Sequence, residues 1–318
     1  MQVGFVGLGT MGASMASNLQ KAGHRLAVYD LRREAAAPHL AAGAVWAPSA
    51  REAAAGAEVA FTSLPGPPEV EAAALGPDGL LAGMRPDTAY FDLSTNSRAM
   101  VQKLHAAFAA KGVHLFDAPV SGGPRGAATR KLALWIGGDP AVFERFKPVL
   151  DAIGDQVRYI GPAGHATVAK LVHNCAGYAL NAALAETFTM GVKAGVDPLV
   201  LFEAIRQGAV GRRRTFDGLI DQFLPNRYEP PAFALRLAHK DVSLAVALGR
   251  EVSVPMRLCN LTLEEMTEAL NRGWGGRDSR VAMVLQQERA GVQVAVEPER
   301  LAAALATDTS TVTEFTPR

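Results

Sequence analysis

The sequence predicts an α/β protein with an N-terminal Rossmann domain, built as a doubly wound sheet, then a long interdomain helix and an all-helical C-terminal domain. Residues 1–160 alternate short apolar runs with alanine-rich amphipathic stretches, which is the pattern of strands and covering helices in a parallel sheet. Residues 165–193 contain no proline, which favours one long helix. Because the pattern after that is helical, we predict domains over residues 1–162 and 163–318.

Individual elements follow from the apolar periodicity and from turn residues. In the second domain, Asp197-Pro198 offers a helix cap with proline at the first helical position, and Gly208 and Gly211 mark a stop. Helices are predicted over Gly12–Gly23, Arg32–Ala42, Met100–Lys111, Phe233–Leu248 and Pro255–Asn271. Strands are predicted over Val3–Val6, Arg25–Tyr29, Val59–Ser63, Thr88–Asp92, His114–Ala118 and Leu132–Ile136.

The composition is that of an ordinary soluble globular protein. The chain has 318 residues, of which 49% are hydrophobic and 20% charged, with a net charge of +1. This balance argues against a nucleic-acid partner, which requires clustered basic residues. No apolar run reaches the length of about 18 residues that a membrane span requires, and Met1–Val6 has the pattern of a strand rather than of a signal peptide. We therefore expect a cytoplasmic protein without a membrane partner.

Cysteine usage points to neither a disulfide framework nor a metal site. Cys175 and Cys259 both lie in apolar helical patterns and are interpreted as buried free thiols. Neither a C-x-x-C nor an H-E-x-x-H spacing occurs, so no metal is predicted.

Residues 7–12, Gly7-Leu8-Gly9-Thr10-Met11-Gly12, match the dinucleotide-binding pattern G-x-G-x-x-G. The motif directly follows a predicted strand and opens a predicted helix, which is the setting that makes it specific. Its glycines would permit a tight turn, close approach of a pyrophosphate and close helix–strand packing. The alternative, a glycine turn without a ligand, requires this setting to be accidental.

Asp30 ends the second predicted strand, about 20 residues after the motif. A carboxylate at this place hydrogen-bonds the adenosine ribose and repels a 2′-phosphate, so NAD is favoured over NADP. Arg32 and Arg33 follow directly, and guanidinium groups can accommodate a 2′-phosphate. NADP therefore stays open as a second cofactor.

The run Phe5–Gly12, continued by Met15, Asn18 and Gly23, resembles the N-terminal signature of the β-hydroxyacid dehydrogenases. This family includes 3-hydroxyisobutyrate dehydrogenase, tartronate semialdehyde reductase and threonate dehydrogenase. Four further blocks agree in order and spacing, so the resemblance covers nearly the whole chain. It implies hydride transfer between a nicotinamide and a small β-hydroxyacid or the matching semialdehyde or keto acid. The implied cofactor contacts beyond residues 7–12 and Asp30 are Leu64, Pro65, Thr95, Phe233 and Lys240.

The block Asp117–Gly123 runs from a predicted strand into a serine and two glycines. Such a turn exposes backbone N–H groups and a hydroxyl, which can cradle a carboxylate. The resemblance assigns the substrate acid group to Ser121, Gly122 and Gly123; an ordinary loop is the alternative.

The block Gly161–Asn174 carries the candidate catalytic lysine. Lys170 and Asn174 are four residues apart and share one face of the predicted helix. Apolar neighbours on both sides of Lys170 indicate a partly buried amine, whose pKa desolvation would lower. The resemblance implies that Lys170 is the general acid/base and that Asn174 binds substrate. His173 lies on another face and is interpreted as structural.

Two places depart from the family pattern. Many relatives carry glycine and threonine where this chain has Arg130 and Lys131, and small polar residues where it has Arg212–Arg214. Arg212–Arg214 are either a solvated charge run or include an arginine that closes on a second anionic or polyhydroxy group of the substrate. The roles of Arg130 and Lys131 stay open.

Two other functions share the expected architecture. An imine reductase would generally lack the lysine at position 170, and a catalytically silent dinucleotide-binding module would have lost it. The presence of Lys170, Asn174 and Ser121 favours the dehydrogenase. The apolar helical domain further suggests a homo-oligomer, either dimer or tetramer.

Overall fold

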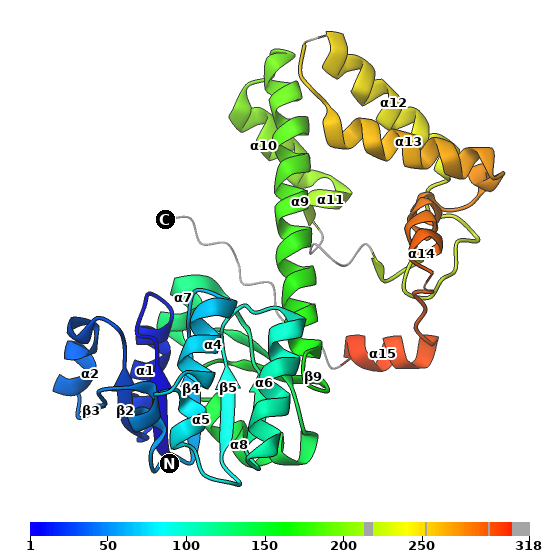
Figure 1. The fold of residues 1–318 in the computed structure, drawn as a ribbon. Coiled ribbons are helices and arrows are strands. Elements are labelled where there is room, and N and C mark those ends of the chain that lie inside the picture. Colours follow the sequence, from blue (N-terminus) through cyan, green and yellow to red (C-terminus); the bar gives the residue numbers. More distant parts are fainter. Residues whose placement is uncertain (213–218, 252, 292, 307–318) are drawn as a thin grey trace. The chain divides into compact units, whose positions relative to one another are not determined.

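The computed structural model describes residues 1–212, 219–251, 253–291 and 293–306. The chain forms two compact units, Met1–Ala176 and Gly177–Arg318. The division falls within α9 (His165–Lys193), the helix predicted over residues 165–193 (Figure 1). The first unit is an α/β sheet domain and the second is helical, as the sequence predicts.

The sheet of the first unit has the strand order β3-β2-β1-β4-β5-β6 in its parallel part. This is the order of a doubly wound dinucleotide-binding sheet, in which a ligand crevice opens beyond the carboxyl ends of the central strands. The strands are β1 (Gln2–Val6), β2 (Arg25–Tyr29), β3 (Val45–Trp46), β4 (Val59–Thr62), β5 (Ala89–Asp92) and β6 (His114–Asp117).

The far edge of the sheet departs from the all-parallel arrangement that we predicted. β8 (Ala133–Gly137) pairs antiparallel with β6 and with β7 (Val120–Ser121), and β9 (Gln156–Gly161) pairs parallel with β8. Between β7 and β8 the chain forms only the short helix α7 (Gly123–Thr129). A parallel return requires a crossover of about a dozen residues or more, so the chain reverses instead. The short strands β3 and β7, and the edge strand β9, were not predicted from the apolar pattern.

The core consists of two apolar layers, one on each face of the sheet. Alternate side chains of each strand enter opposite layers because the side-chain period of a strand is two. On one face Phe5, Phe61, Phe91 and Phe116 form a row across neighbouring strands, with ring centroids 6.0, 5.6 and 4.4 Å apart in that order. α1 (Gly12–Lys21) and α8 (Pro140–Leu150) supply side chains to this face, and α3 (Ala50–Ala54), α4 (Pro67–Leu75), α5 (Leu80–Gly83) and α6 (Arg98–Ala110) to the other.

Helix starts follow local capping groups. α6 begins two residues before the predicted start because the Ser97 hydroxyl accepts the Met100 N–H at 3.2 Å. The helix predicted over Arg32–Ala42 forms in two parts, a 3₁₀ turn η1 (Arg33–Ala36) and α2 (Ala37–Ala41). The break coincides with Pro38, which lies in the first turn of α2, where proline is tolerated.

The second unit contains α10 (Pro198–Gln207), α11 (Ala209–Arg212), α12 (Leu235–Glu251), α13 (Arg257–Asn271), 3₁₀ turns η3 (Trp274–Gly276) and η4 (Ser279–Met283), α14 (Val284–Ala290) and α15 (Pro298–Ala306). Asp197 caps α10 as predicted, its carboxylate accepting the Val200 N–H at 3.1 Å. The Glu186 carboxylate accepts the N–H groups of Leu258 and Cys259 at the start of α13. Cys259 is a free, half-buried thiol.

The sequence predicts a buried Cys175 thiol and no membrane-spanning helix. The Cys175 side chain lies outside the described residues, so its burial stays a prediction. None of the helices in the described ranges combines the length and the apolar character needed to cross a membrane.

Candidate active site

The glycine loop lies between β1 and α1, beside the neighbouring strand β4. Gly7 has φ +94° and donates its N–H to the Tyr29 carbonyl at 2.9 Å. A Cβ on Gly7 would lie 2.4 Å from the Ser63 carbonyl oxygen, and one on Gly12 would lie 1.9 Å from the Gly7 carbonyl oxygen. The first and third glycines are therefore required for the packing of the loop against its own helix and against the end of β4.

Gly9 differs from the other two glycines of the motif. A Cβ on Gly9 would have no heavy atom within 4 Å, and its φ is not positive. It precedes α1, whose first turn has neither a side-chain cap nor an acidic residue. Open space beside uncapped N–H groups of a helix start is what a pyrophosphate requires. The loop therefore fits a dinucleotide.

Asp30 is fixed against the loop. Its Oδ2 accepts the Leu8 N–H at 2.7 Å and its Oδ1 accepts the Arg32 N–H at 2.9 Å. The Asp30 side chain is 13% exposed, whereas that of Arg32 is 68% exposed with its Nε 3.9 Å from Oδ1. The carboxylate thus keeps a defined place at the end of β2, as binding of a ribose there would need.

A buried polar network lies under the loops that carry Leu64, Pro65 and Thr95. The Leu64 N–H donates to the Ser94 hydroxyl at 3.0 Å, while Pro65 and Thr95 are exposed. Asp92 accepts hydrogen bonds from Thr62, Ser94 and Asn96. Burial raises the pKa of the Asp92 carboxyl. Sequence reasoning missed Asp92 as the group that ties the ends of β4 and β5 together.

The serine–glycine turn is shaped by backbone conformations that favour glycine. Gly122 has φ +136° and Gly123 has φ +63°. A Cβ on Gly122 would lie 2.8 Å from the Lys131 carbonyl oxygen, whereas one on Gly123 would meet nothing within 4 Å. Ser121 is half-buried and both glycines are exposed. The turn therefore presents a hydroxyl beside open backbone, as the carboxylate-binding prediction requires.

Asn18 links the cofactor loop's helix to this turn. Its side chain is buried, and its Nδ2 donates to the Ala127 carbonyl of α7 at 2.8 Å. We expect Asn18→Leu to lower the free energy of unfolding by about 1–3 kcal/mol, since the Ala127 carbonyl would be left without its donor. Urea unfolding of both proteins measures this. Lys21→Ala, an exposed position on the same helix, should change stability by less than about 0.5 kcal/mol; equal effects would contradict the role of Asn18.

Lys170 lies near the start of α9 and is 9% exposed. Burial lowers the pKa of its ammonium group. Its Nζ lies 6.0 Å from the centroid of the Trp135 ring on β8. Among the described residues, its ammonium has neither a hydrogen bond nor an ion pair. Lys170 is thus the buried amine that the sequence predicts, but its apolar neighbours do not bury it, because Val168, Leu171 and Val172 are exposed.

The start of α9 is anchored to the sheet by Asp117. This buried carboxylate accepts the N–H groups of Gly164 and Thr167 at 2.8 and 2.7 Å. Asp117 ends β6, so the sheet and the lysine-bearing helix are joined by two charge-assisted hydrogen bonds. The sequence pattern gave Asp117 no such role.

His173 connects the lysine to the serine turn. Its Nε2 lies 3.2 Å from the Ser121 Oγ, and its ring packs edge-to-face on Trp135 with centroids 5.4 Å apart. The structure therefore brings Ser121 and Lys170 into one neighbourhood, with Trp135 and His173 between them. Asn174 follows on the same helix and is half-buried. Trp135 was not singled out in the sequence, because nothing local marks a tryptophan on a strand as part of a site.

The basic residues that depart from the family pattern have different surroundings in the structure. Arg130 has φ +60°, a left-handed conformation at the end of α7, and its guanidinium donates to the Asp151 carbonyl at 3.2 Å. This conformation explains why glycine suits the position. Lys131 and Arg212 are exposed, and Arg213 and Arg214 lie outside the described residues.

Two predicted cofactor contacts belong to the second unit. Phe233 is 45% exposed, and its N–H donates to the fully buried Asp278 carboxylate at 3.2 Å. The Ser279 N–H donates to the Phe233 carbonyl at 2.8 Å. Asp278 and Ser279 therefore fix the backbone that carries this ring. Lys240 lies on α12, and its side chain is outside the described residues.

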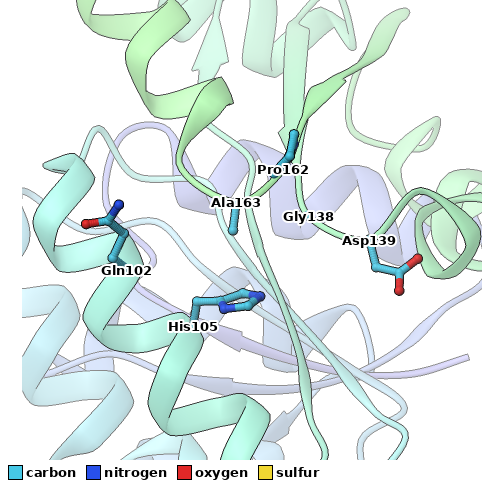
Figure 2. A pocket seen from close by; sticks show the side chains of 6 residues that line it. All are labelled: Gln102, His105, Gly138, Asp139, Pro162 and Ala163. Carbon is cyan, nitrogen blue, oxygen red and sulfur yellow. The ribbon is translucent and has the colours of Figure 1, made fainter.

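A separate hollow of about 470 Å³ lies beside α6 (Figure 2). Its lining contains none of the residues predicted to bind cofactor or substrate. The lining residues are Gln102, His105, Gly138, Asp139, Pro162 and Ala163.

Family models match both parts of the chain. Residues 2–161 match the NAD binding domain of 6-phosphogluconate dehydrogenase, and residues 164–287 match the NAD-binding domain of NADP-dependent 3-hydroxyisobutyrate dehydrogenase. The chain is also similar to an NAD-dependent L-serine dehydrogenase of Pseudomonas aeruginosa, with 37% identity over 89% of this chain and 97% of the relative.

Solved structures agree with this assignment. A Mycobacterium tuberculosis 3-hydroxyisobutyrate dehydrogenase with L-serine has 30% identity and a TM-score of 0.63, covering 89% of this chain and 98% of that one. An imine reductase from Pseudomonas sp. reaches a TM-score of 0.73 with the same coverage, but its 16% identity shows the fold alone. The chain belongs to the β-hydroxyacid dehydrogenase family of NAD(P)-binding oxidoreductases.

Proposed function

We propose that this enzyme interconverts a small β-hydroxyacid and the matching semialdehyde or keto acid, with Lys170 as general acid/base. The observation that carries the proposal is the buried Lys170 amine, held in one neighbourhood with the Ser121 hydroxyl by Trp135 and His173. A proton-transfer group and an acid-binding turn are the two parts that oxidation of a hydroxyacid requires.

The residues divide the chemistry as follows. Ser121 and the open backbone at Gly122–Gly123 hold the substrate carboxylate, and Asn174 binds the reacting hydroxyl beside Lys170. The neutral Lys170 amine takes the hydroxyl proton during oxidation, and its ammonium returns that proton during reduction. When bound, the nicotinamide accepts or donates the hydride. Burial lowers the pKa of Lys170, so its neutral form is available at lower pH than for an exposed lysine.

Residues 7–12 would hold the dinucleotide, together with Asp30, Leu64, Pro65 and Thr95 of the first unit and Phe233 and Lys240 of the second. We propose NAD rather than NADP as the preferred form, because the Asp30 carboxylate is anchored at the end of β2, where its charge would repel a 2′-phosphate. Arg32 and Arg33 are exposed at the same strand end, so NADP is the alternative to be tested.

Replacing Asp30 with asparagine should shift cofactor choice toward NADP. The amide keeps one acceptor oxygen, which can accept the Leu8 N–H, while it gives up the Arg32 N–H bond and the charge that repels a phosphate. We expect the ratio of kcat/KM for NADP to that for NAD to rise by about tenfold or more. Initial rates with both cofactors measure the ratio. Glu34→Gln removes an exposed carboxylate from the following turn and should leave it unchanged; an unaltered ratio in Asp30→Asn would remove the basis for the NAD assignment.

A substrate panel tests the proposed reaction. Purified enzyme with NAD or NADP is mixed with L-serine, which is named for two of the similar proteins, and with 3-hydroxyisobutyrate, glycerate and threonate. Reduced nicotinamide is followed by absorbance. Turnover that requires Lys170 would support the proposal, whereas reduction of cyclic imines in preference to hydroxyacid turnover would support an imine reductase. We also expect a cytoplasmic homo-oligomer, whose size light scattering would measure.

A further inference from the structure

We propose that Trp135 and His173 are positioning residues of this site, the indole holding the Lys170 ammonium and the His173 ring, and the imidazole orienting the Ser121 hydroxyl. The proposal rests on the proposed function, in which Lys170 transfers the proton and Ser121 binds the acid. The contacts among these residues join β7, β8 and α9 into one connected group.

The contacts form a chain from the amine to the hydroxyl. The Lys170 Nζ lies over the Trp135 ring at 6.0 Å, within the range of a cation–π interaction. The same ring supports His173 edge-to-face at 5.4 Å, and the His173 Nε2 is 3.2 Å from the Ser121 Oγ. The backbone N–H of Trp135 donates to the Pro119 carbonyl at 3.3 Å, which holds the main chain that carries the indole.

The direction of the His173–Ser121 hydrogen bond decides what Ser121 can do. If the imidazole Nε2–H donates to the Ser121 oxygen, the hydroxyl proton stays free to donate to a substrate carboxylate. If Nε2 instead accepted that proton, the hydroxyl could not serve the acid group. The productive arrangement is therefore the Nε2–H form.

The charges around Lys170 favour a role for the indole. Asp117 on β6 is engaged by two backbone N–H groups of the α9 start, and Ser121 on β7 is neutral. His173 on α9 is the titratable neighbour, and both burial and the Lys170 charge lower the pKa of its imidazole, which favours its neutral form. Within the described ranges, the indole face is thus the group that offers the ammonium a compensating electrostatic contact.

A double-mutant cycle tests the action of His173 through Ser121. His173→Leu should raise KM for the hydroxyacid about tenfold with little change in kcat, since one positioned hydrogen bond is lost. His173→Gln, whose amide can donate to the Ser121 oxygen, should recover most of the affinity. In a Ser121→Ala background, His173→Leu should have little further effect. The neighbouring exposed Val172→Ala is the control. Additive effects of His173→Leu and Ser121→Ala would overturn the proposal.

Site-specific fluorinated tryptophans at position 135 test the indole. Fluorination weakens the negative potential of the ring face while keeping its shape, so the charged lysine is destabilised. Competitive acetylation with acetic anhydride, read by mass spectrometry at Lys170, gives the pH midpoint of its reactivity without any substrate. We expect the midpoint to fall stepwise, by about half a pH unit or more over the series. Leu134→Val, a buried change on the same strand, should lower stability without moving the midpoint.

The outcomes separate this inference from the proposed function. A midpoint that falls with fluorination supports the contact even if none of the panel hydroxyacids is turned over, which would count against the proposed function alone. A midpoint independent of fluorination in an enzyme that turns over hydroxyacids would overturn the role of Trp135 and leave the proposed function standing.

Discussion

Lys170→Ala should lower kcat for hydroxyacid oxidation by about 10²–10⁴, the usual contribution of a positioned general acid/base. The affinity for the dinucleotide should stay within about twofold of wild type, because residues 7–12 and Asp30 do not contact Lys170. Steady-state kinetics and fluorescence titration of the reduced cofactor measure the two effects. Lys193→Ala, which removes an exposed lysine from the last turn of the same helix, is the matched control.

The same residue predicts two dependences on pH. Oxidation needs the neutral amine, so kcat/KM should rise with pH through the lowered pKa of Lys170, and reduction should fall there. For stability, the unfolded chain binds the proton more tightly than the folded one, so the penalty for burying the charge is complete below the folded pKa. It disappears as pH rises toward the unfolded value. Lys170→Met should therefore raise the melting temperature at neutral pH and lose this advantage at high pH. A variant that loses stability and cofactor binding together would make Lys170 structural.

A matched pair of glycine substitutions should separate binding from folding. Gly9→Val places its side chain in open space, so we expect a normal unfolding transition but a loss of NAD affinity of about tenfold or more, since the pyrophosphate would need that space. Gly12→Val brings a side chain against the Gly7 carbonyl oxygen, so the domain itself should be destabilised by at least about 3 kcal/mol.

Thermal unfolding and isothermal titration with NAD measure both variants. The two variants should differ in which property they lose: Gly9→Val should lose NAD affinity, whereas Gly12→Val should lose stability. If Gly9→Val bound NAD normally, the open space would not be the cradle of the pyrophosphate. If Gly12→Val folded as stably as the wild type, the close approach of helix and loop would not be what requires glycine at position 12.

The parts of the site that could be predicted are those that one stretch of chain specifies. The glycine loop and Asp30 follow from a strand–turn–helix pattern. The burial of Lys170 was predicted for the wrong reason, because its apolar neighbours Val168, Leu171 and Val172 are exposed. Trp135 could not be found in this way, because its contacts join β8 to a helix that begins far along the chain. The roles of Asp92 and Asp117 could not be predicted for a related reason. A carboxylate at a strand end has the same local sequence whether it faces solvent or accepts several buried hydrogen bonds.

The fold shows the same division. The parallel strands from β1 to β6 follow from alternating strand and helix patterns, whereas the reversal into β8 depends on how little chain separates it from β7. Arg130 illustrates the limit at a single position. Its left-handed φ is set by the tight end of α7 and not by its own preference, so the sequence marked the position as a departure without predicting the turn that it occupies.

The anchoring of α9 by Asp117 has a consequence for how members of such a family can diverge. Every residue to which we assign proton transfer or acid binding lies within Met1–Ala176, either in the first turns of α9, whose start is tied to the sheet, or at β7 and the turn that follows it. The two anchoring hydrogen bonds come from backbone N–H groups and from Asp117, so they do not depend on which side chains follow position 176. Relatives can keep this anchor while the rest of the chain diverges.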